Sequence, residues 1–175
     1  MRQLINLIFL LLITSSASAQ SAYIPPEKPK LVIGIVVEQL RYDQLERIWD
    51  ILPDDGLKRM INEGTYYRNA SIDYLSTQAG PGFATISTGA PPSAHGITSD
   101  MWYHPFNDEM IYCVSDASVN AVGGSFETGL YSPVNLLSST FSDELLAATC
   151  GGSKVYGIGI REMSAILTTG HSADG

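Results

Sequence analysis

The residues best placed for chemistry lie in one stretch, STQAGPGFATISTGAPPSAHGI, which runs from Ser76 to Ile97. A Gly-Pro-Gly turn at 80–82 opens a short helical run, and a second turn rich in glycine and proline ends at His95. A helix that begins at such a turn directs free backbone N–H groups toward an anion. A nucleophilic hydroxyl is expected just before the turn, but the residue there is Ala79. The stretch therefore has the build of a site, and it is either an active site or only the frame of one.

Two apolar runs are predicted to form the strands that position this site. KLVIGIVVEQL and SKVYGIGI are rich in β-branched residues on both alternating faces, which is typical of parallel strands covered on both sides. We predict parallel strands of one sheet at about 32–37 and 154–160. Ligands of open α/β sheets bind beyond the carboxyl ends of the strands. Glu38, residues 77–82 and residues 161–163 are therefore expected around one site, with Glu38 as a candidate metal ligand.

The remaining segments alternate between helix and strand patterns. Helical spacing appears in RYDQLERIWDIL, in LKRMINEG and in SPVNLLSSTFSDELLAATCGG, with Asn135 as its expected cap. MSAILTTG begins a further segment that is either helix or loop. TYYRNASIDYL alternates like a strand, and residues 101–115 indicate a hairpin with a turn at Asn107-Asp108. This order predicts an α/β fold, a mainly parallel sheet flanked by helices. Because the chain stops shortly after a buried strand, we expect the fold to be incomplete at its C-terminal side.

Length and charge narrow the classes of function. The chain has 175 residues, of which 45% are hydrophobic, and a formal net charge of −8. This length suits one globular domain. An acidic chain gains no counterion-release attraction to a phosphate backbone, so nucleic acid is not an expected partner. Neither the length nor the charge indicates an oligomeric state.

The first twenty residues, MRQLINLIFLLLITSSASAQ, have the three parts of a secretory signal. Arg2 is followed by an apolar run at 4–13 and by Ala17-Ser18-Ala19, a cleavage pattern. The alternative, a membrane anchor, would need about 20 apolar residues to cross the bilayer. We predict a signal peptide at 1–19, an extended leader at 20–29, a domain at 30–175, and a secreted or periplasmic protein without a membrane partner after cleavage.

The chain has two cysteines, Cys113 and Cys150. An oxidising compartment would permit a disulfide, but two free thiols fit the sequence equally well. Neither cysteine lies in a CxxC or Cys/His cluster, so a zinc finger is not supported.

In order along the chain, a set of segments resembles the alkaline phosphatase superfamily. They are VVEQLRYDQLERIWD, GLKRMINEGTYYRNA, AGPGFATISTG-x-PPSAHGI, MWY, PVNLLSSTFSDELLAAT, SKVYGIGI and SAILTTGHSADG. The nearest resemblance is to secreted bacterial phosphatases with a threonine nucleophile, relatives of the nucleotide pyrophosphatase/phosphodiesterases. It runs from about Lys30 to the last residue and covers about the N-terminal third of a family chain. It implies a hydrolase of phosphate esters with two zinc ions.

Carried over by this resemblance, the family's functional positions all hold different residues here. The first metal-ligand aspartate falls on Glu38, and the nucleophilic threonine on Ala79. The phosphate-binding asparagine falls on Asp100, and the phosphate-binding lysine and arginine fall on Arg161 and Met163. A methyl group cannot form a phosphoryl-enzyme intermediate. The resemblance thus implies the family's frame with altered chemistry.

Two hypotheses about function follow. The first is a degenerate or truncated member that no longer turns over phosphate esters and survives by binding a phosphate ester or another small anion. The second is an active zinc-dependent phosphomonoesterase or phosphodiesterase whose nucleophile has moved, with Thr77 as the substitute. His95 and His171 match framework positions of the family, and His104 is expected on a surface hairpin.

Overall fold

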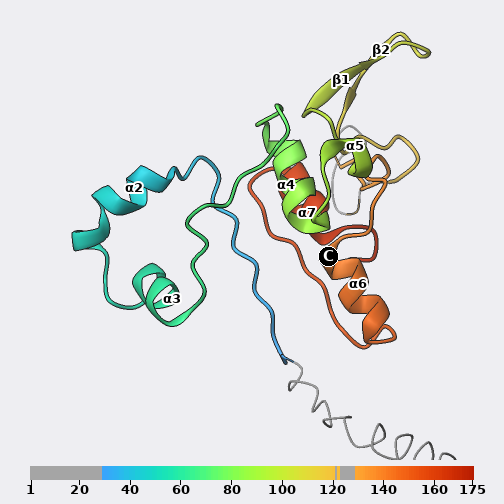
Figure 1. Ribbon diagram of the computed structural model, residues 1–175. Helices are drawn as coiled ribbons and strands as arrows, with labels where there is room; N and C mark the ends of the chain where they lie inside the picture. The colour runs from blue at the N-terminus through green and yellow to red at the C-terminus, as the bar shows by residue number, and fades with distance from the viewer. Residues whose placement is uncertain (1–28, 121, 123–128) are drawn as a thin grey trace, which may run out of the picture. The chain divides into compact units, whose positions relative to one another are not determined.

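The computed structural model describes residues 29–120, 122 and 129–175 (Figure 1). The predicted signal peptide and nearly all of the leader lie outside these residues. Within them, no helix combines the length and apolar character that crossing a membrane requires. Contacts divide the chain into two units, Met1–Gln39 and Leu40–Gly175.

The described part of the first unit is an extended segment. Residues 31–37 form no strand, and their apolar side chains are exposed. The segment ends in a turn at Glu38 and Gln39, where Gln39 has a positive φ of 59°. The strand predicted at 32–37 is thus extended but not paired with any described residue.

The second unit begins with short helices. α2 (Tyr42–Arg47) is followed by the 3-10 turn η2 (Trp49–Ile51), and α3 (Leu57–Glu63) ends at Gly64, as the sequence predicts. The prediction of a strand from TYYRNASIDYL is wrong, because residues 65–75 form no β-ladder with any residue that the structure describes. Period-2 alternation gives a strand only where a neighbouring strand accepts its hydrogen bonds.

The elements around the candidate site follow in order. They are α4 (Ala79–Thr88), α5 (Pro92–His95), β1 (Met101–His104), β2 (Glu109–Tyr112), α6 (Phe141–Ala148) and α7 (Glu162–Thr169). β1 and β2 form the predicted antiparallel hairpin, with Tyr103 opposite Met110. Of the two alternatives for MSAILTTG, helix or loop, the structure has the helix, as α7.

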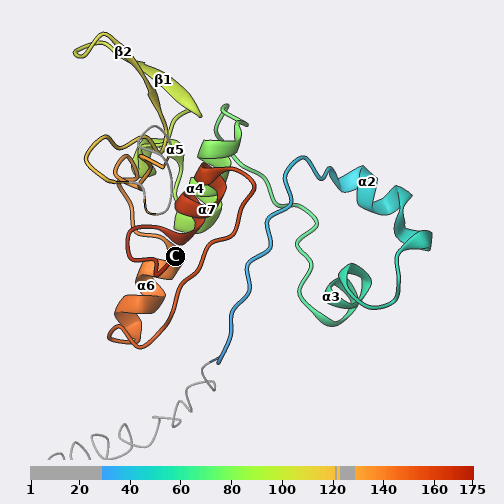
Figure 2. The ribbon, with the colours of Figure 1, turned by 180° about the vertical axis from the view of Figure 1, so that it is seen from behind.

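The core of this unit lies between α4 and α7. The two helices pack side by side in both views (Figures 1 and 2), and Ser87 Oγ on α4 donates to Leu167 O on α7 at 2.6 Å. The buried hydrophobic residues of this core are Phe83, Ala84, Ile97, Cys113, Val114, Leu136, Met163 and Leu167. The packing brings the first turns of both helices to one cluster.

Helix α6 begins later than the sequence predicts. Thr140 caps it, because its Oγ1 accepts from Asp143 N at 3.2 Å while the Asp143 carboxylate accepts from Thr140 N at 2.9 Å. Asn135 is not the cap, since its side chain donates to Cys113 O at 3.3 Å. Both residue types satisfy the free N–H groups of a first turn, so tertiary contacts decided between them.

The described residues contain one sheet, the β1–β2 hairpin. Neither 32–37 nor 154–160, the two segments predicted as parallel strands, forms a strand among the residues that the structure describes. Residues 154–160 are extended and hydrogen-bond only to 174 and 175 through Val155 and Gly157. A central parallel strand needs a neighbour on each edge and a layer on each face, and the described residues supply only part of this surrounding.

Candidate functional site

The Gly-Pro-Gly sequence forms the first turn of α4 rather than a turn before it. Gln78 is the extended N-cap residue, and Ala79 is the first helical residue. Pro81 is tolerated here because the first N–H groups of a helix have no intrahelical acceptor. Ala79 is half-buried and packs against the core. Its methyl group therefore occupies the position where the resemblance places a nucleophile.

The Asp100 carboxylate lies on the N-terminus of α4. Gly80 N donates to Asp100 Oδ1 at 2.6 Å. In return, Gln78 Oε1 accepts from Asp100 N at 2.7 Å and from Ser99 Oγ at 2.6 Å. A negative charge at this place is favourable because the helix dipole and the free N–H groups attract anions. The Gly80 amide is therefore already bound by a carboxylate of the protein itself, that of Asp100.

Cys113 lies beside Gly80 on the buried side of the site. It is fully buried, and its N–H donates to Asp100 O at 2.9 Å. A Cβ added to Gly80 would lie 3.0 Å from Asp100 Oδ1 and 3.3 Å from Cys113 Sγ, so only glycine fits comfortably. Burial, together with the negative charge of Asp100, raises the pKa of the Cys113 thiol to about 12.

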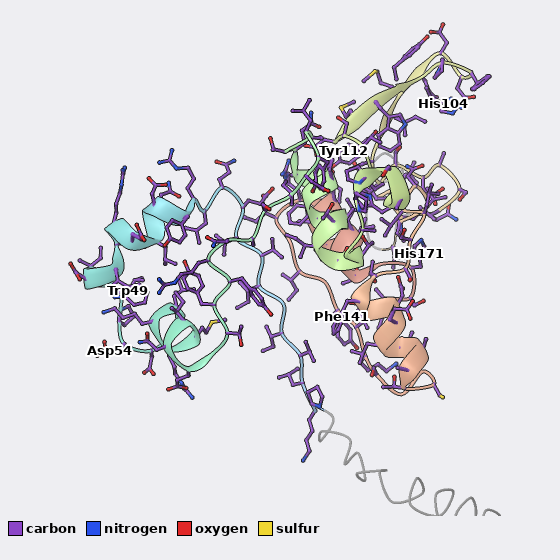
Figure 3. The ribbon with its side chains drawn as sticks, in the orientation of Figure 1. Trp49, Asp54, His104, Tyr112, Phe141 and His171 are labelled. Carbon is purple, nitrogen blue, oxygen red and sulfur yellow. The ribbon has the colours of Figure 1, made fainter. Side chains whose placement is uncertain are left out.

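The start of α7 contributes to the same region. Arg161 is the exposed N-cap residue, and its positive charge opposes the raised pKa values of Cys113 and Tyr112. Burial and a hydrogen bond to Glu162 raise the pKa of Tyr112, which lies at the end of β2 (Figure 3). The Met163 side chain is only 2% exposed and belongs to the hydrophobic core. The structure brings the starts of α4 and α7 together, as predicted for 77–82 and 161–163. However, Met163, one of the two positions where the resemblance places a cation, is apolar.

Two further residues of the predicted site, Thr77 and Glu38, are exposed. Thr77 is exposed and precedes Ala79 by two residues. Glu38 is exposed in the turn that ends the described part of the first unit. The roles of both residues stay predictions.

The histidines have structural positions. His95 is buried, accepts from Ile97 N through Nδ1 at 3.1 Å, and pairs through Nε2 with Thr85 Oγ1 at 3.1 Å. Burial lowers its pKa, so the neutral ring stabilises the turn after α5. His171 contacts Asp143 and Leu136 O, and His104 ends β1 out on the hairpin (Figure 3). The framework interpretation of His95 is confirmed.

A two-zinc centre does not fit the residues that the structure describes. Among them, no group of three or more His, Cys, Asp and Glu side chains could hold a metal ion. Zinc needs about four nitrogen, sulfur or carboxylate ligands around each ion. The described site therefore offers no complete ligand set.

Sequence reasoning missed Cys113 and Tyr112 as parts of the site, and it gave no role to Gln78 and Glu162, which lie inside the expected ranges 77–82 and 161–163. Gln78 carries no clear signal, because it precedes Gly-Pro-Gly by two residues and glutamine is not among the preferred N-cap residues. Tyr112 is the last residue of the hairpin, Cys113 follows it, and neither residue lies in a motif. Their place depends on the packing of the hairpin against α4, which local patterns do not encode.

The two cysteines are free in the structure, Cys113 buried and Cys150 exposed. We expect one thiol per native chain to react rapidly with Ellman's reagent at pH 8, and two after denaturation. The reactive species is the thiolate, which burial disfavours at Cys113. Cys150→Ser is the control and should abolish the rapid phase. Two rapid thiols in the native chain would contradict the buried position of Cys113.

Comparison with known proteins agrees with this geometry. The family model described as type I phosphodiesterase / nucleotide pyrophosphatase matches residues 32–155. A protein of Myroides odoratus named calcium-transporting ATPase is 45% identical over 148 residues, which are 85% of this chain and 27% of that protein. Alkaline phosphatase PhoV of Synechococcus elongatus is 42% identical over 173 residues, 94% of this chain and 32% of its own.

The crystal structure of wild-type alkaline phosphatase PafA has the same fold. It matches with a TM-score of 0.81 and 41% identity over 84% of this chain and 28% of that chain. The chain thus spans about a third or less of the length of these relatives. The expected alkaline-phosphatase-like α/β fold is confirmed by this match. The chain belongs to the type I phosphodiesterase / nucleotide pyrophosphatase family, within the alkaline phosphatase superfamily.

Proposed function

We propose that this chain is a degenerate phosphatase-like protein that does not hydrolyse phosphate esters. The observation that carries the proposal is the Asp100 carboxylate, 2.6 Å from the Gly80 amide at the start of α4. A phosphate oxygen bound at that amide would have to displace a charge of its own sign. Coulomb repulsion between two unit charges about 4 Å apart is of the order of 1–4 kcal/mol in a partly solvated site.

The neighbouring positions support the same proposal. Ala79 offers a methyl group, which cannot attack phosphorus. Met163 is buried in the core, so the only cation of the pair carried over from the family is Arg161. A single guanidinium, at a site whose amide already binds the Asp100 carboxylate, gives a weaker anion site than two cations beside a free amide.

The alternative, hydrolysis by a relocated nucleophile, rests on Thr77. Its hydroxyl is exposed, but two residues of extended chain displace it by roughly 6–7 Å from the position of Ala79. In-line attack tolerates much smaller errors, since misplacement by about 1 Å can cost a hundredfold in rate. We therefore favour the inactive protein.

Hydrolysis of p-nitrophenyl phosphate by the purified chain, with added Zn²⁺, tests the proposal. We expect a rate equal to that of a mock purification from cells that carry the empty vector. The matched variant is Thr77→Ala. Zinc-dependent hydrolysis that Thr77→Ala abolishes would show a relocated nucleophile and overturn the proposal.

Zinc binding is a separate prediction. Glu38 is the only metal-ligand position carried over from the family apart from the nucleophile, and the described residues offer no cluster around it. We expect much less than one zinc ion per chain after dialysis, measured by atomic emission, and no change for Glu38→Ala. A stoichiometric ion that Glu38→Ala removes would contradict this.

The proposal includes export and a small ligand. The signal pattern at 1–19 supports secretion or a periplasmic location, and mass spectrometry of the mature protein should then give Gln20 as its first residue. Detection of Met1 in the exported protein would contradict cleavage. The resemblance supports a phosphate ester or another small anion as any remaining ligand, and the acidic charge argues against nucleic acid.

A further inference from the structure

The side chain of Gln78 makes its hydrogen bonds outside its own helix. Gln78 is the N-cap residue of α4, but its side chain makes no cap hydrogen bond to that helix. Gln78 Oε1 instead accepts from Asp100 N at 2.7 Å and from Ser99 Oγ at 2.6 Å. The Asp100 carboxylate in return accepts from Gly80 N at 2.6 Å. The exchange is reciprocal, as in a capping box, although residues 78 and 100 are 22 positions apart. Asp100 therefore caps α4 in place of Gln78.

Two anchors fix the main chain of Asp100. Its N–H donates to Gln78 Oε1, and its carbonyl oxygen accepts from Cys113 N at 2.9 Å. Cys113 is fully buried in the core, whereas Gln78 is exposed. Gln78 is therefore the anchor that a substitution can remove without leaving a cavity in the core.

The first turn of α4 offers few amides to an anion. Pro81 has no N–H, and Gly82 N donates back to the carbonyl oxygen of the N-cap residue at 3.2 Å. The other amides of residues 79–82 are those of Ala79 and Gly80, which have no acceptor within the helix. The Asp100 carboxylate binds the Gly80 amide, and because it belongs to the same chain it competes with a free anion at a high effective concentration. A free anion can bind the Gly80 amide only when Asp100 moves away.

We propose that Gln78 is a positioning residue, which holds the Asp100 carboxylate on the Gly80 amide and so closes the start of α4 to free anions. This closure rests on the proposed loss of phosphate hydrolysis, since the same carboxylate carries both. It adds that the closure depends on an exposed side chain two residues before Gly80. Removal of this side chain should open the amide while the core stays folded.

Nuclear magnetic resonance of the full chain with inorganic phosphate tests this role. In the unchanged chain we expect phosphate to leave the Gly80 amide resonance unshifted. Gln78→Met keeps the length of the side chain but lacks the acceptor oxygen. The Gly80 amide should then exchange its hydrogen about tenfold faster, and phosphate should shift its resonance. Asp100→Ala removes the carboxylate itself and should give the same phosphate-dependent shift.

Two further variants separate positioning from a general loss of structure. Gln78→Glu keeps an acceptor oxygen at the same place and should retain the slow exchange of Gly80. Gln44→Met is the matched control, because Gln44 Oε1 accepts from Arg41 N at 2.9 Å at the start of α2. It removes a hydrogen bond of the same kind and should leave the Gly80 amide unchanged.

Four results would each overturn this role of Gln78. They are a phosphate-dependent shift of Gly80 in the unchanged chain, no such shift in Gln78→Met or in Asp100→Ala, equal exchange of Gly80 in Gln78→Met and the unchanged chain, and an equal effect of Gln44→Met. Hydrolysis of p-nitrophenyl phosphate by the unchanged chain is measured separately. It would overturn the proposed function, whereas the Gly80 amide reports on the closure itself.

Discussion

Ala79→Thr is expected to leave the chain without measurable phosphatase activity. Restoring the hydroxyl does not remove the Asp100 carboxylate from the Gly80 amide, and it does not replace the buried Met163 by a cation. Groups that act as one catalytic unit are strongly non-additive, so returning one of them while others are absent yields little. The measurement is zinc-supplemented hydrolysis of p-nitrophenyl phosphate against a mock purification.

Complete repair should have a large effect. The chain is joined to the part of PafA outside the matched segment and carries Glu38→Asp, Ala79→Thr, Asp100→Asn, Arg161→Lys and Met163→Arg. We expect this protein to exceed the same graft without the five changes by at least about a thousandfold in rate, since each electrostatic group contributes about a hundredfold or more. The control keeps Ala79 and carries the other four changes, and it should stay at background. If the graft with all five substitutions folds but is inactive, or if the control is active, the family's functional positions have been assigned to the wrong residues of this chain.

Leu167→Ala should cause the largest loss of stability. Leu167 is fully buried between α7 and α4, and its carbonyl accepts the Ser87 hydroxyl. Truncation removes buried methyl groups and leaves a cavity, which costs about 2–5 kcal/mol in the free energy of unfolding. Chemical denaturation followed by circular dichroism measures this value from the shift of the midpoint.

Ile86→Ala is the matched control for this prediction. It removes a similar volume from α4, but its side chain is exposed. We expect a change of about 0.5 kcal/mol or less, typical of surface positions. Equal losses for the two variants would mean that α4 and α7 do not form the core of this unit.

Several elements were predictable because their signals are local. α3 ends at Gly64, which fits a glycine C-cap, and the β1–β2 hairpin forms around a turn that contains Asp108 in the left-handed region. α7 also begins within one residue of Met163, where the sequence indicates the start of a helical or loop segment. In each case neighbouring residues supply the hydrogen bonds or the backbone freedom that the element needs.

Long-range packing decided the rest. Continuous apolar runs at 32–37 and 154–160 predict buried strands, but a strand is made by its neighbours, and the described residues pair only the beginning of the second run with residues 174 and 175. The cap of α6 moved from Asn135 to Thr140 because Cys113 O accepts the Asn135 amide. No local pattern contains these partners.

The sequence by itself determined which chemical groups are present. It placed Ala79 where a hydroxyl is expected, and no folding can turn that methyl group into a nucleophile. Only the tertiary structure decided that the Asp100 carboxylate, twenty residues away, would lie 2.6 Å from the Gly80 amide, and that Met163 would point into the core. The reason is physical: residue identity fixes the available atoms, whereas the distance between an amide and a carboxylate depends on how α4, the hairpin and α7 pack around Cys113.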